Sequence, residues 1–250
     1  MREKRRTRRK YMKKRKTRRL RHKGGSESYT AILIEPRRLM QMPLEFVINN
    51  ILENLPLTWN VIVFSGVENT KDVTGFIHTL PPDKQSRVTV KDLGLASMNT
   101  GQYNKLMMSR RVLDEIPTEL FLVVQTDSLI CKGGVPLLDK FMKYEYVGAP
   151  WKDRNAIGNG GFSLRRKAKM LEIVAKCPTL QHNEDGFFSG GCEGAVPSKP
   201  TPEEAEEFSV ETIFNGKQPF GIHKAWHHMP DKASELEEKC PGYTALQKMN

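Results

Sequence analysis

Short apolar runs alternate with amphipathic stretches along the chain, and this order predicts a fold of repeating strands and helices. The apolar runs are rich in β-branched residues and are followed by turn residues, which is typical of buried strands. In residues 44–55 the apolar positions recur three or four residues apart, as on one face of a helix. Residues 103–116 show the same spacing and stop before Pro117. The predicted strands span residues 29–35, 60–64, 87–91 and 120–125.

The pattern becomes less regular after Gly133. Because strands alternate with helices before that point, the predicted fold class is α/β, with a mainly parallel central sheet covered on both faces. We expect one domain over residues 28–230, a disordered tail over 1–27 before it and a peripheral segment over 231–250 after it. The elements expected in the irregular part are short strands over 146–149 and 161–164, a helix over 166–176, an acidic helix over 203–214 and a strand or loop over 221–226.

Positive charge is concentrated in the first 25 residues. They hold 15 Lys or Arg and one Glu, a local net charge of +14, whereas the other 225 residues carry a net charge of −3. This segment has too few apolar residues to form a core, so disorder is expected. Residues 2–23 are typical of a nuclear localisation signal that binds an import receptor, or of an electrostatic anchor for nucleic acid. A solvated extension without a partner is the third interpretation.

The sequence argues against several other classes of protein. It has neither the apolar core of a secretory signal nor a run of 18 apolar residues, so we expect a cytosolic or nuclear protein that does not span a membrane. The cysteines are widely spaced and form no CxxC pair, which disfavours a zinc ribbon or a redox dithiol. Reduced thiols are therefore expected at Cys131, Cys177, Cys192 and Cys240.

Polar residues follow the predicted strands at the places where a parallel sheet binds ligands, beyond the carboxyl ends of its strands. These residues are Glu35-Pro36-Arg37, Ser65-Gly66 and Thr126-Asp127-Ser128. A carboxylate such as Asp127 can hold a divalent cation, which in turn neutralises a diphosphate. The alternative is that Asp127 only caps a turn.

A glycine-rich segment, Gly158-Asn159-Gly160-Gly161-Phe162-Ser163, lies later in the chain. It matches neither GxGxxG nor a P-loop, and Arg165 replaces the last glycine of a GxSxG elbow. It is either a turn whose backbone approaches a ligand, with Asn159 and Ser163 as hydrogen-bonding groups, or an ordinary hairpin.

Two further groups are candidates for chemistry. Glu184 and Asp185 precede two phenylalanines, and burial beside them would raise a carboxylate pKa toward the range of a general base. The alternative is a pair of acidic residues at the start of a helix. His223 is a candidate metal ligand, with His227 four residues later, although a structural or exposed histidine is the more common case.

Taken together, EPR after the first strand, QTDS after the fourth, VGAPW, GNGGFSLR, NED and a late HK-x-W resemble a known family. It is a GT-A-like glycosyltransferase domain family of officially unknown function, known from large DNA viruses, fungi and bacteria. The resemblance covers about residues 29–228 and is most specific in GNGGFSLR and NED. It implies a single GT-A-like, Rossmann-like domain and a location in a host cell or a virion.

The resemblance also implies roles for particular residues. A nucleotide-sugar donor would lie over the strand ends, and Asp185 or Glu184 would deprotonate an acceptor hydroxyl. Asp127 takes the position of the GT-A metal motif, and His223 corresponds to a late histidine that completes metal or diphosphate binding. The remaining implied residues are Glu35, Arg37, Ser65, Gly66 and Lys105 for the donor, and Trp151, Asn159, Gly160, Gly161 and Ser163 for the sugar and acceptor.

The chain departs from the family pattern at the metal motif. GT-A enzymes often have Asp-x-Asp, whereas Asp127-Ser128-Leu129 supplies one carboxylate. Either Asp127 and His223 together hold Mn²⁺ or Mg²⁺, or cationic side chains such as Arg37, Lys105 or Arg165 stabilise the departing diphosphate. The sequence thus favours an inverting glycosyltransferase with an unidentified acceptor. The alternative is a non-catalytic nucleic-acid-binding protein that acts through its basic tail.

Overall fold

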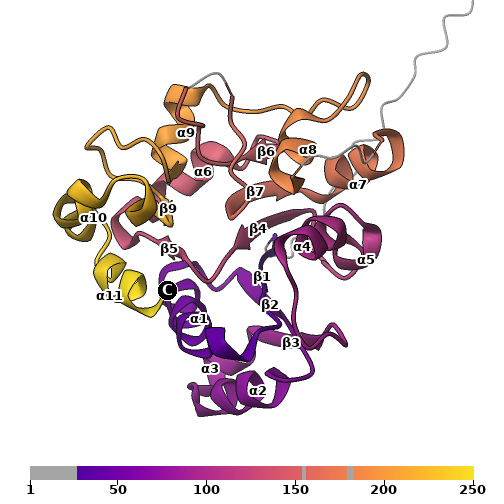
Figure 1. Ribbon diagram of the computed structural model, residues 1–250, viewed down its shortest axis with the longest axis vertical. Helices are drawn as coiled ribbons and strands as arrows, with labels where there is room; N and C mark the ends of the chain where they lie inside the picture. The colour runs from indigo at the N-terminus through magenta and orange to yellow at the C-terminus, as the bar shows by residue number, and fades with distance from the viewer. Residues whose placement is uncertain (1–26, 154–155, 179–182) are drawn as a thin grey trace, which may run out of the picture.

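The computed structural model describes residues 27–153, 156–178 and 183–250. Its centre is a six-stranded sheet with the order β3-β2-β1-β4-β7-β6 (Figure 1). Strands β1 to β4 are parallel, and β7 and β6 continue the sheet in antiparallel pairing. The predicted α/β class with a mainly parallel sheet is confirmed. The strands are β1 (Tyr29–Ile34), β2 (Trp59–Ser65), β3 (Val88–Asp92), β4 (Leu120–Val124), β6 (Tyr146–Val147) and β7 (Phe162–Arg166).

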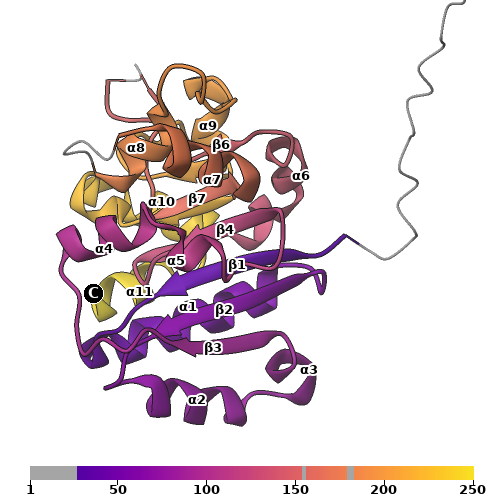
Figure 2. The same cartoon turned by 90° about the vertical axis from the view of Figure 1, so that its right-hand side faces the viewer.

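The two faces of the sheet are covered by different helices, as Figure 2 shows. Successive strand residues point to opposite faces, so Ala31 and Leu33 join one apolar cluster while Ile32 and Ile34 join the other. Burying each such side chain contributes about 1.5–3 kcal/mol. The first cluster includes side chains of α1 (Gln41–Asn54) and α2 (Thr70–Thr79), and the second those of α4 (Thr100–Met107), α5 (Arg110–Leu113) and α7 (Lys167–Lys176).

The prediction of one continuous helix over residues 103–116 is wrong, because α4 and α5 are two separate helices. A capping box between Asn99 and Gln102 starts α4 earlier, and the backbone at Ser109 is extended, which ends α4 and caps α5. The acidic helix predicted over 203–214 is also too long. Helix α9 (Pro202–Phe208) begins at a second capping box between Thr201 and Glu204, and residues 209–210 leave it to form a strand.

A second, three-stranded sheet has the order β5-β9-β8. Its strands are β5 (Ser128–Ile130), β8 (Ser209–Val210) and β9 (Gly221–His223). Pairing of Ser128 with His223 brings the end of the fourth predicted strand next to a residue almost a hundred positions later. The other elements are α3 (Pro82–Gln85), α6 (Leu138–Phe141), α8 (Glu184–Gly190), α10 (Ala233–Lys239), α11 (Tyr243–Met249), and the 3-10 turns η1 (Arg38–Met40), η2 (Lys132–Leu137), η3 (Ala225–His227) and η4 (Pro230–Lys232).

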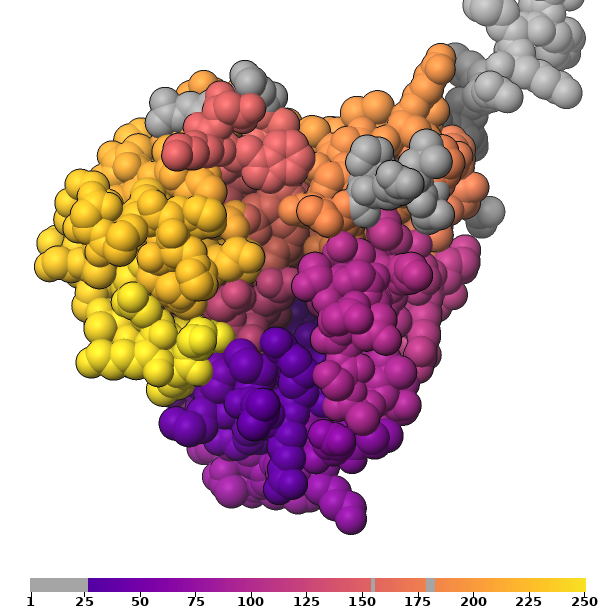
Figure 3. Space-filling model, viewed as in Figure 1, coloured from indigo at the N-terminus to yellow at the C-terminus, as the bar shows by residue number. Residues whose placement is uncertain are grey.

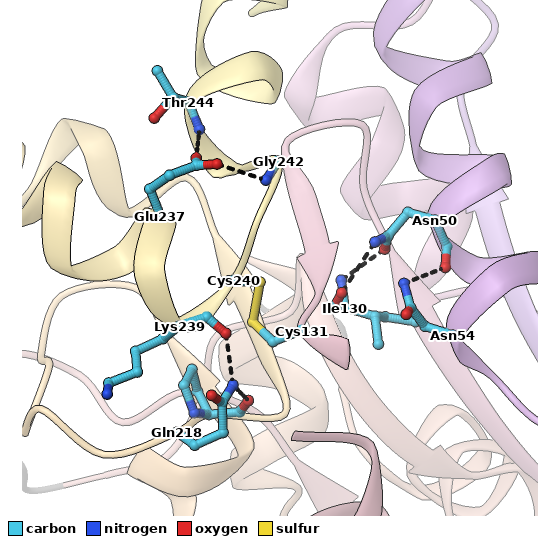
Figure 4. Close-up of a disulfide and its surroundings, with 11 residues drawn as sticks. Asn50, Asn54, Ile130, Cys131, Gln218, Glu237, Lys239, Cys240, Gly242 and Thr244 are labelled. Carbon is cyan, nitrogen blue, oxygen red and sulfur yellow. Dashed lines mark hydrogen bonds between the residues drawn. A yellow bond between two sulfur atoms is a disulfide. The ribbon is translucent and has the colours of Figure 1, made fainter. Parts of the chain in front are cut away.

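The C-terminal helices pack into the core. Leu236, Tyr243 and Leu246 are fully buried in the first apolar cluster. Figure 4 shows how this segment is held: a disulfide joins Cys131 to Cys240, and the side-chain amide of Gln218 donates a hydrogen bond of 2.9 Å to the carbonyl oxygen of Lys239.

The expectation of reduced thiols is wrong. A second disulfide joins Cys177 to Cys192, so all four cysteines are paired. Their wide spacing gave no sign of the pairing, because the Cys131–Cys240 partners are 109 residues apart and meet only through the fold. Disulfides of this kind are typical of oxidising compartments.

Two further predictions concern membrane-spanning helices and the N-terminal tail. None of the helices in the described ranges is long and apolar enough to cross a membrane. The predicted disordered tail lies outside the described residues, apart from Glu27.

Candidate active site

A cavity of about 340 Å³ opens beyond the carboxyl ends of β1 and β4. Figure 3 shows this side of the molecule, on which the indigo start of the described chain, the magenta α4 region and the C-terminal half surround a hollow. Most of the contributing segments follow a strand or begin a helix, and residues 159–161 lead directly into β7, so the sheet fixes the positions of the polar groups. The lining includes Glu35, Arg37, Asn99, Tyr103, Asn104, Gln125, Asp127, Asn159, Gly160, Gly161, Asn183, Glu184, Asp185, Glu211, His223 and Lys224.

Asp127 and His223 face one another in this cavity. Asp127 Oδ1 lies 3.2 Å from His223 Nε2, and neither atom makes a hydrogen bond of acceptable geometry, although both are inaccessible to solvent. On the other side of the ring, His223 Nδ1 lies 2.8 Å from Asn159 Oδ1 and 3.4 Å from Glu211 Oε1. Asn159 Oδ1 also accepts a hydrogen bond from the backbone N–H of Gly161, which identifies it as the amide oxygen.

These contacts fix the tautomer of His223. Amide and carboxylate oxygens near Nδ1 can only accept, so Nδ1 carries a proton and donates it. In the neutral ring Nε2 then presents a lone pair to the Asp127 carboxylate, which is repulsive unless a proton or a cation lies between them. Burial alone lowers the pKa of His223, but the Asp127 and Glu211 carboxylates outweigh it and raise the pKa to about 9.

The same two atoms fit a divalent cation. Ligands at right angles and about 2.1 Å from a cation lie about 3 Å apart, close to the separation of Asp127 Oδ1 and His223 Nε2. Asn159 and Glu211 hold the far side of the imidazole, as outer partners of metal-bound histidines do. The described residues contain no group of three or more His, Cys, Asp or Glu arranged for a metal, so other ligands would have to be substrate oxygens and water.

Glu184 and Asp185 are adjacent but have different surroundings. Glu184 is buried and receives two hydrogen bonds from Arg165, of 2.9 and 3.2 Å, and Arg165 itself is fully buried between the rings of Tyr146 and Phe188. Each Glu184 oxygen thus accepts a hydrogen bond from the Arg165 guanidinium, which holds this carboxylate in a buried ion pair. Asp185 is partly exposed, lines the cavity and accepts a hydrogen bond from the backbone N–H of Gly186.

Two glycines let these groups approach the backbone. A Cβ atom on Gly161 would lie 2.3 Å from the His223 ring and 2.7 Å from Gln125 Oε1. A Cβ atom on Gly160 would lie 2.2 Å from Glu184 Oε1. The glycine-rich turn therefore works by leaving space for neighbouring side chains.

Not all of the predicted site residues reach the cavity. Those that line it are Glu35, Arg37, Asp127, Asn159, Gly160, Gly161, Glu184, Asp185 and His223. Arg37 binds Glu35 through two hydrogen bonds, of 2.8 and 2.6 Å, so this pair forms one unit at the end of β1. Those outside the lining are Ser65, Gly66, Lys105, Trp151 and Ser163.

The residues outside the lining have other surroundings. Ser65 bonds to Thr70, and Gly66 packs so closely on Pro36 and Leu95 that a Cβ atom would lie 2.2 Å from the Leu95 carbonyl oxygen. The Ser163 hydroxyl accepts a hydrogen bond from the Arg165 guanidinium and donates one to the carbonyl oxygen of Gly160. These bonds stabilise the glycine-rich turn. Trp151 covers Gly158, and Lys105 is exposed on α4.

Several residues of the cavity were not predicted from the sequence, among them Tyr103, Gln125, Glu211 and Lys224. Tyr103 and Gln125 lie in elements that were predicted, but nothing in their spacing distinguished them from core residues. Glu211 was assigned to a helix. Lys224 has a left-handed backbone, with φ of 34°, and donates its N–H to the Asp127 carbonyl oxygen, a conformation that no local pattern indicates.

Comparisons with known proteins agree with this architecture. The model of a family described as "Protein of unknown function (DUF5672)" matches residues 87–223. No curated protein matches the sequence.

Three solved structures are similar in fold. S. aureus TarS, in complex with UDP-GlcNAc, is 12% identical with a TM-score of 0.50, over 89% of this chain and 70% of that one. Mannosyltransferase PcManGT from Pyrobaculum calidifontis, in complex with GDP-Man and Mn²⁺, is 16% identical with a TM-score of 0.52, over 70% and 54%. The galactosyltransferase LgtC, in complex with donor and acceptor sugar analogues, is 10% identical with a TM-score of 0.54, over 88% and 94%. At these identities the similarity shows the fold alone, which is the GT-A glycosyltransferase fold.

Proposed function

The chain belongs to the DUF5672 family, whose model covers more than half of it, and we propose that it is a nucleotide-sugar-dependent glycosyltransferase. The observation that carries this proposal is the buried pair of Asp127 Oδ1 and His223 Nε2, 3.2 Å apart and without a hydrogen bond of acceptable geometry, at the strand ends of a GT-A fold. They lie in the same cavity as the partly exposed carboxylate of Asp185.

Asp127 and His223 are the residues that would hold Mn²⁺ or Mg²⁺ in this proposal. When bound, the cation would neutralise the diphosphate of the donor and stabilise the charge that develops as it leaves. Of the cationic side chains considered from the sequence, Arg165 is fully buried against Glu184 and Lys105 lies outside the cavity. Arg37 and Lys224 line the cavity and are the cations available to contact phosphate oxygens.

Asp185 is proposed as the general base. Its carboxylate would take the proton of an acceptor hydroxyl as that oxygen forms a bond to the anomeric carbon. The bond between the anomeric carbon and the nucleoside diphosphate breaks on the opposite face, so the configuration at that carbon inverts. Glu184 would take no part in proton transfer, because its pairing with Arg165 gives it a structural task.

The Asp185→Asn variant tests the assignment of the base. Loss of a general base lowers turnover by about 100- to 10,000-fold. Affinity for the donor should stay unchanged, because the amide keeps the shape of the side chain. Turnover is measured as release of the nucleoside diphosphate in the presence of acceptor, and donor affinity by calorimetry. Near-normal turnover of this variant would exclude Asp185 as the base.

A further inference from the structure

One polar group in the cavity has no task in the proposed mechanism. Among the described residues, six buried side-chain atoms lack a hydrogen-bond partner, and three of them belong to residues that line this cavity. Asp127 Oδ1 and His223 Nε2 are accounted for by the cation. The third atom is the phenol oxygen of Tyr103, which is inaccessible to solvent in the unliganded protein.

Tyr103 is held firmly in place. It lies in the first turn of α4, whose start is fixed by the capping box of Asn99 and Gln102. The next residue, Asn104, donates a hydrogen bond to Asn183 at the start of α8, while Leu106 and Met107 are buried in the second apolar cluster. These contacts fix α4 and keep the phenol at the cavity wall beside Gln125, where it makes no hydrogen bond of acceptable geometry.

The surroundings of the phenol are polar and predominantly acidic. Burial raises the pKa of Tyr103, the nearby Glu184 carboxylate raises it further, and the phenol therefore remains a hydrogen-bond donor. The Asp127 carboxylate also raises the pKa of Tyr103. Arg165, a cation that lowers this pKa, is already bound to Glu184. The neutral side-chain amide of Gln125 faces the phenol and extends to Gly161, beside the His223 ring.

We propose that Tyr103 and Gln125 form the subsite for the donor sugar, in which the phenol donates a hydrogen bond to a sugar hydroxyl. The inference rests on the proposed glycosyltransferase function. A hydroxyl can accept from Tyr103 and bond to the amide of Gln125, which matches the two groups present. A sugar carboxylate would find no free side-chain cation among the groups around the phenol, because Arg165 is bound to Glu184, whereas a neutral hydroxyl can pair with both the phenol and the amide. The subsite therefore favours a neutral sugar over a uronic acid.

The Tyr103→Phe variant tests this subsite by binding. The probes are UDP, UDP-glucose, UDP-GlcNAc, UDP-glucuronate, GDP and GDP-mannose, measured by calorimetry with Mn²⁺ present. We expect the neutral nucleotide sugars that bind the wild type to bind the variant about three- to tenfold more weakly, which is the effect of one hydrogen bond. The affinity for UDP or GDP alone should not change. Because the phenol has no partner to lose, the melting temperature of the unliganded variant should not fall.

Tyr243→Phe is the matched control. The Tyr243 oxygen is also buried without a partner, but it lies on α11 beside Trp226, outside the cavity lining. This variant should bind every probe as the wild type does.

The outcomes separate this inference from the proposed function. If the wild type binds UDP or GDP and Tyr103→Phe binds nucleotide sugars equally well, the subsite is refuted and the transferase proposal stands. Equal weakening of nucleoside diphosphate and nucleotide sugar would also refute it, because Tyr103 would then contact the diphosphate. Binding of UDP-glucuronate as tight as that of UDP-glucose would refute the selection for neutral sugars. If the wild type binds none of the six probes, the proposed function fails and the subsite fails with it.

Discussion

At the scale of single residues, the chemistry of the cavity depends on which polar atoms the protein leaves unpaired. Asn159 and Glu211 occupy Nδ1 of His223 and so direct its Nε2 toward Asp127. Arg165 occupies both oxygens of Glu184 and so leaves Asp185 as the accessible acid of the pair. In both cases a neighbouring side chain holds one polar group and leaves another facing the cavity, where the proposed role requires it.

The Gly161→Ala variant should disturb His223. The added methyl group would lie 2.3 Å from the imidazole, so the ring must leave its present position beside Asp127. Overpacking of this kind typically costs about 1–3 kcal/mol of folding free energy. We expect metal-dependent donor binding to weaken by about tenfold or more, measured by calorimetry.

Gly75→Ala is the control for that substitution. Gly75 lies inside α2 with no atom within 4 Å of a built Cβ, so alanine should raise stability by up to about 1 kcal/mol and leave donor binding unchanged. Unchanged donor binding in Gly161→Ala would show that the close approach of His223 to the turn has no functional importance.

The sequence identified residues at this scale only where a motif marked them. Asp127 follows an apolar strand, and Asp185 and His223 lie in motifs of the resembled family, so all three could be named in advance. Tyr103 and Gln125 could not, because a tyrosine on an amphipathic helix and a glutamine after a strand look like ordinary packing residues. Arg165 appeared to be a candidate phosphate ligand, and only its complete burial shows that it is structural.

At the scale of elements, α8 carries Asp185 and is bracketed by the disulfide between Cys177 and Cys192. The bond closes a short loop, and its removal should therefore release the end of the segment that positions the proposed base. In the chain-entropy account, a loop of about 15 residues contributes about 3 kcal/mol. The Cys177→Ser/Cys192→Ser double variant should lose about this much stability in denaturant unfolding and should also lose turnover.

The Cys131→Ser/Cys240→Ser double variant provides the comparison. Its loop is longer, so this variant should lose more stability. The chain-entropy account gives a loss of about 4.7 kcal/mol for a loop of about 100 residues. Titration of thiols in the denatured, unreduced protein should find none. Four free thiols in that titration would contradict both pairings.

Glu237 links the last two helices and should make stability depend on acid pH. Its carboxylate accepts hydrogen bonds from the backbone N–H groups of Thr244, at 2.7 Å, and Gly242, at 3.0 Å (Figure 4). Burial acts to raise the pKa of Glu237, but these two hydrogen bonds outweigh it and the pKa lies below its ordinary value.

The sign of that dependence follows from the lowered pKa. The contribution of Glu237 is fully present above the unfolded-state pKa near 4.5 and is lost as the pH falls through the lower folded-state value. Glu237→Gln should therefore be less stable than the wild type at pH 7, and the difference should shrink as the pH falls below about 4.5. A stability difference that is constant from pH 7 to pH 3 would contradict this role.

Local patterns predicted the four parallel strands and helix α1, because each apolar run there is bounded by turn residues, but they did not indicate α2 and α3. They failed where pairing is long-range. Strands β8 and β9 are two and three residues long and exist through pairing with each other and with β5. The break between α4 and α5 depends on one extended residue, Ser109, within a continuous helical spacing.

At the scale of the whole molecule, the sheet places the cavity and the second sheet completes it. The parallel strands bring Glu35 and Asp127 to one edge, and β9 adds His223 from late in the chain. The alternation of strands and helices was sufficient to predict the α/β class and the edge at which the site lies. The role of residues 2–23 in binding nucleic acid or an import receptor rests on their charge and stays a prediction.

The central claim is that this cavity binds a nucleotide sugar through Asp127 and His223, and thermal stability tests it most directly. The 250-residue protein is melted with a panel of nucleotide sugars, with and without Mn²⁺ or Mg²⁺. A ligand at 100 times its dissociation constant stabilises the native state by about 2.7 kcal/mol. The account predicts a shift with a particular donor that requires the cation and is absent in Asp127→Ala. A folded wild-type protein that no nucleotide sugar stabilises, with or without the cation, would contradict the account.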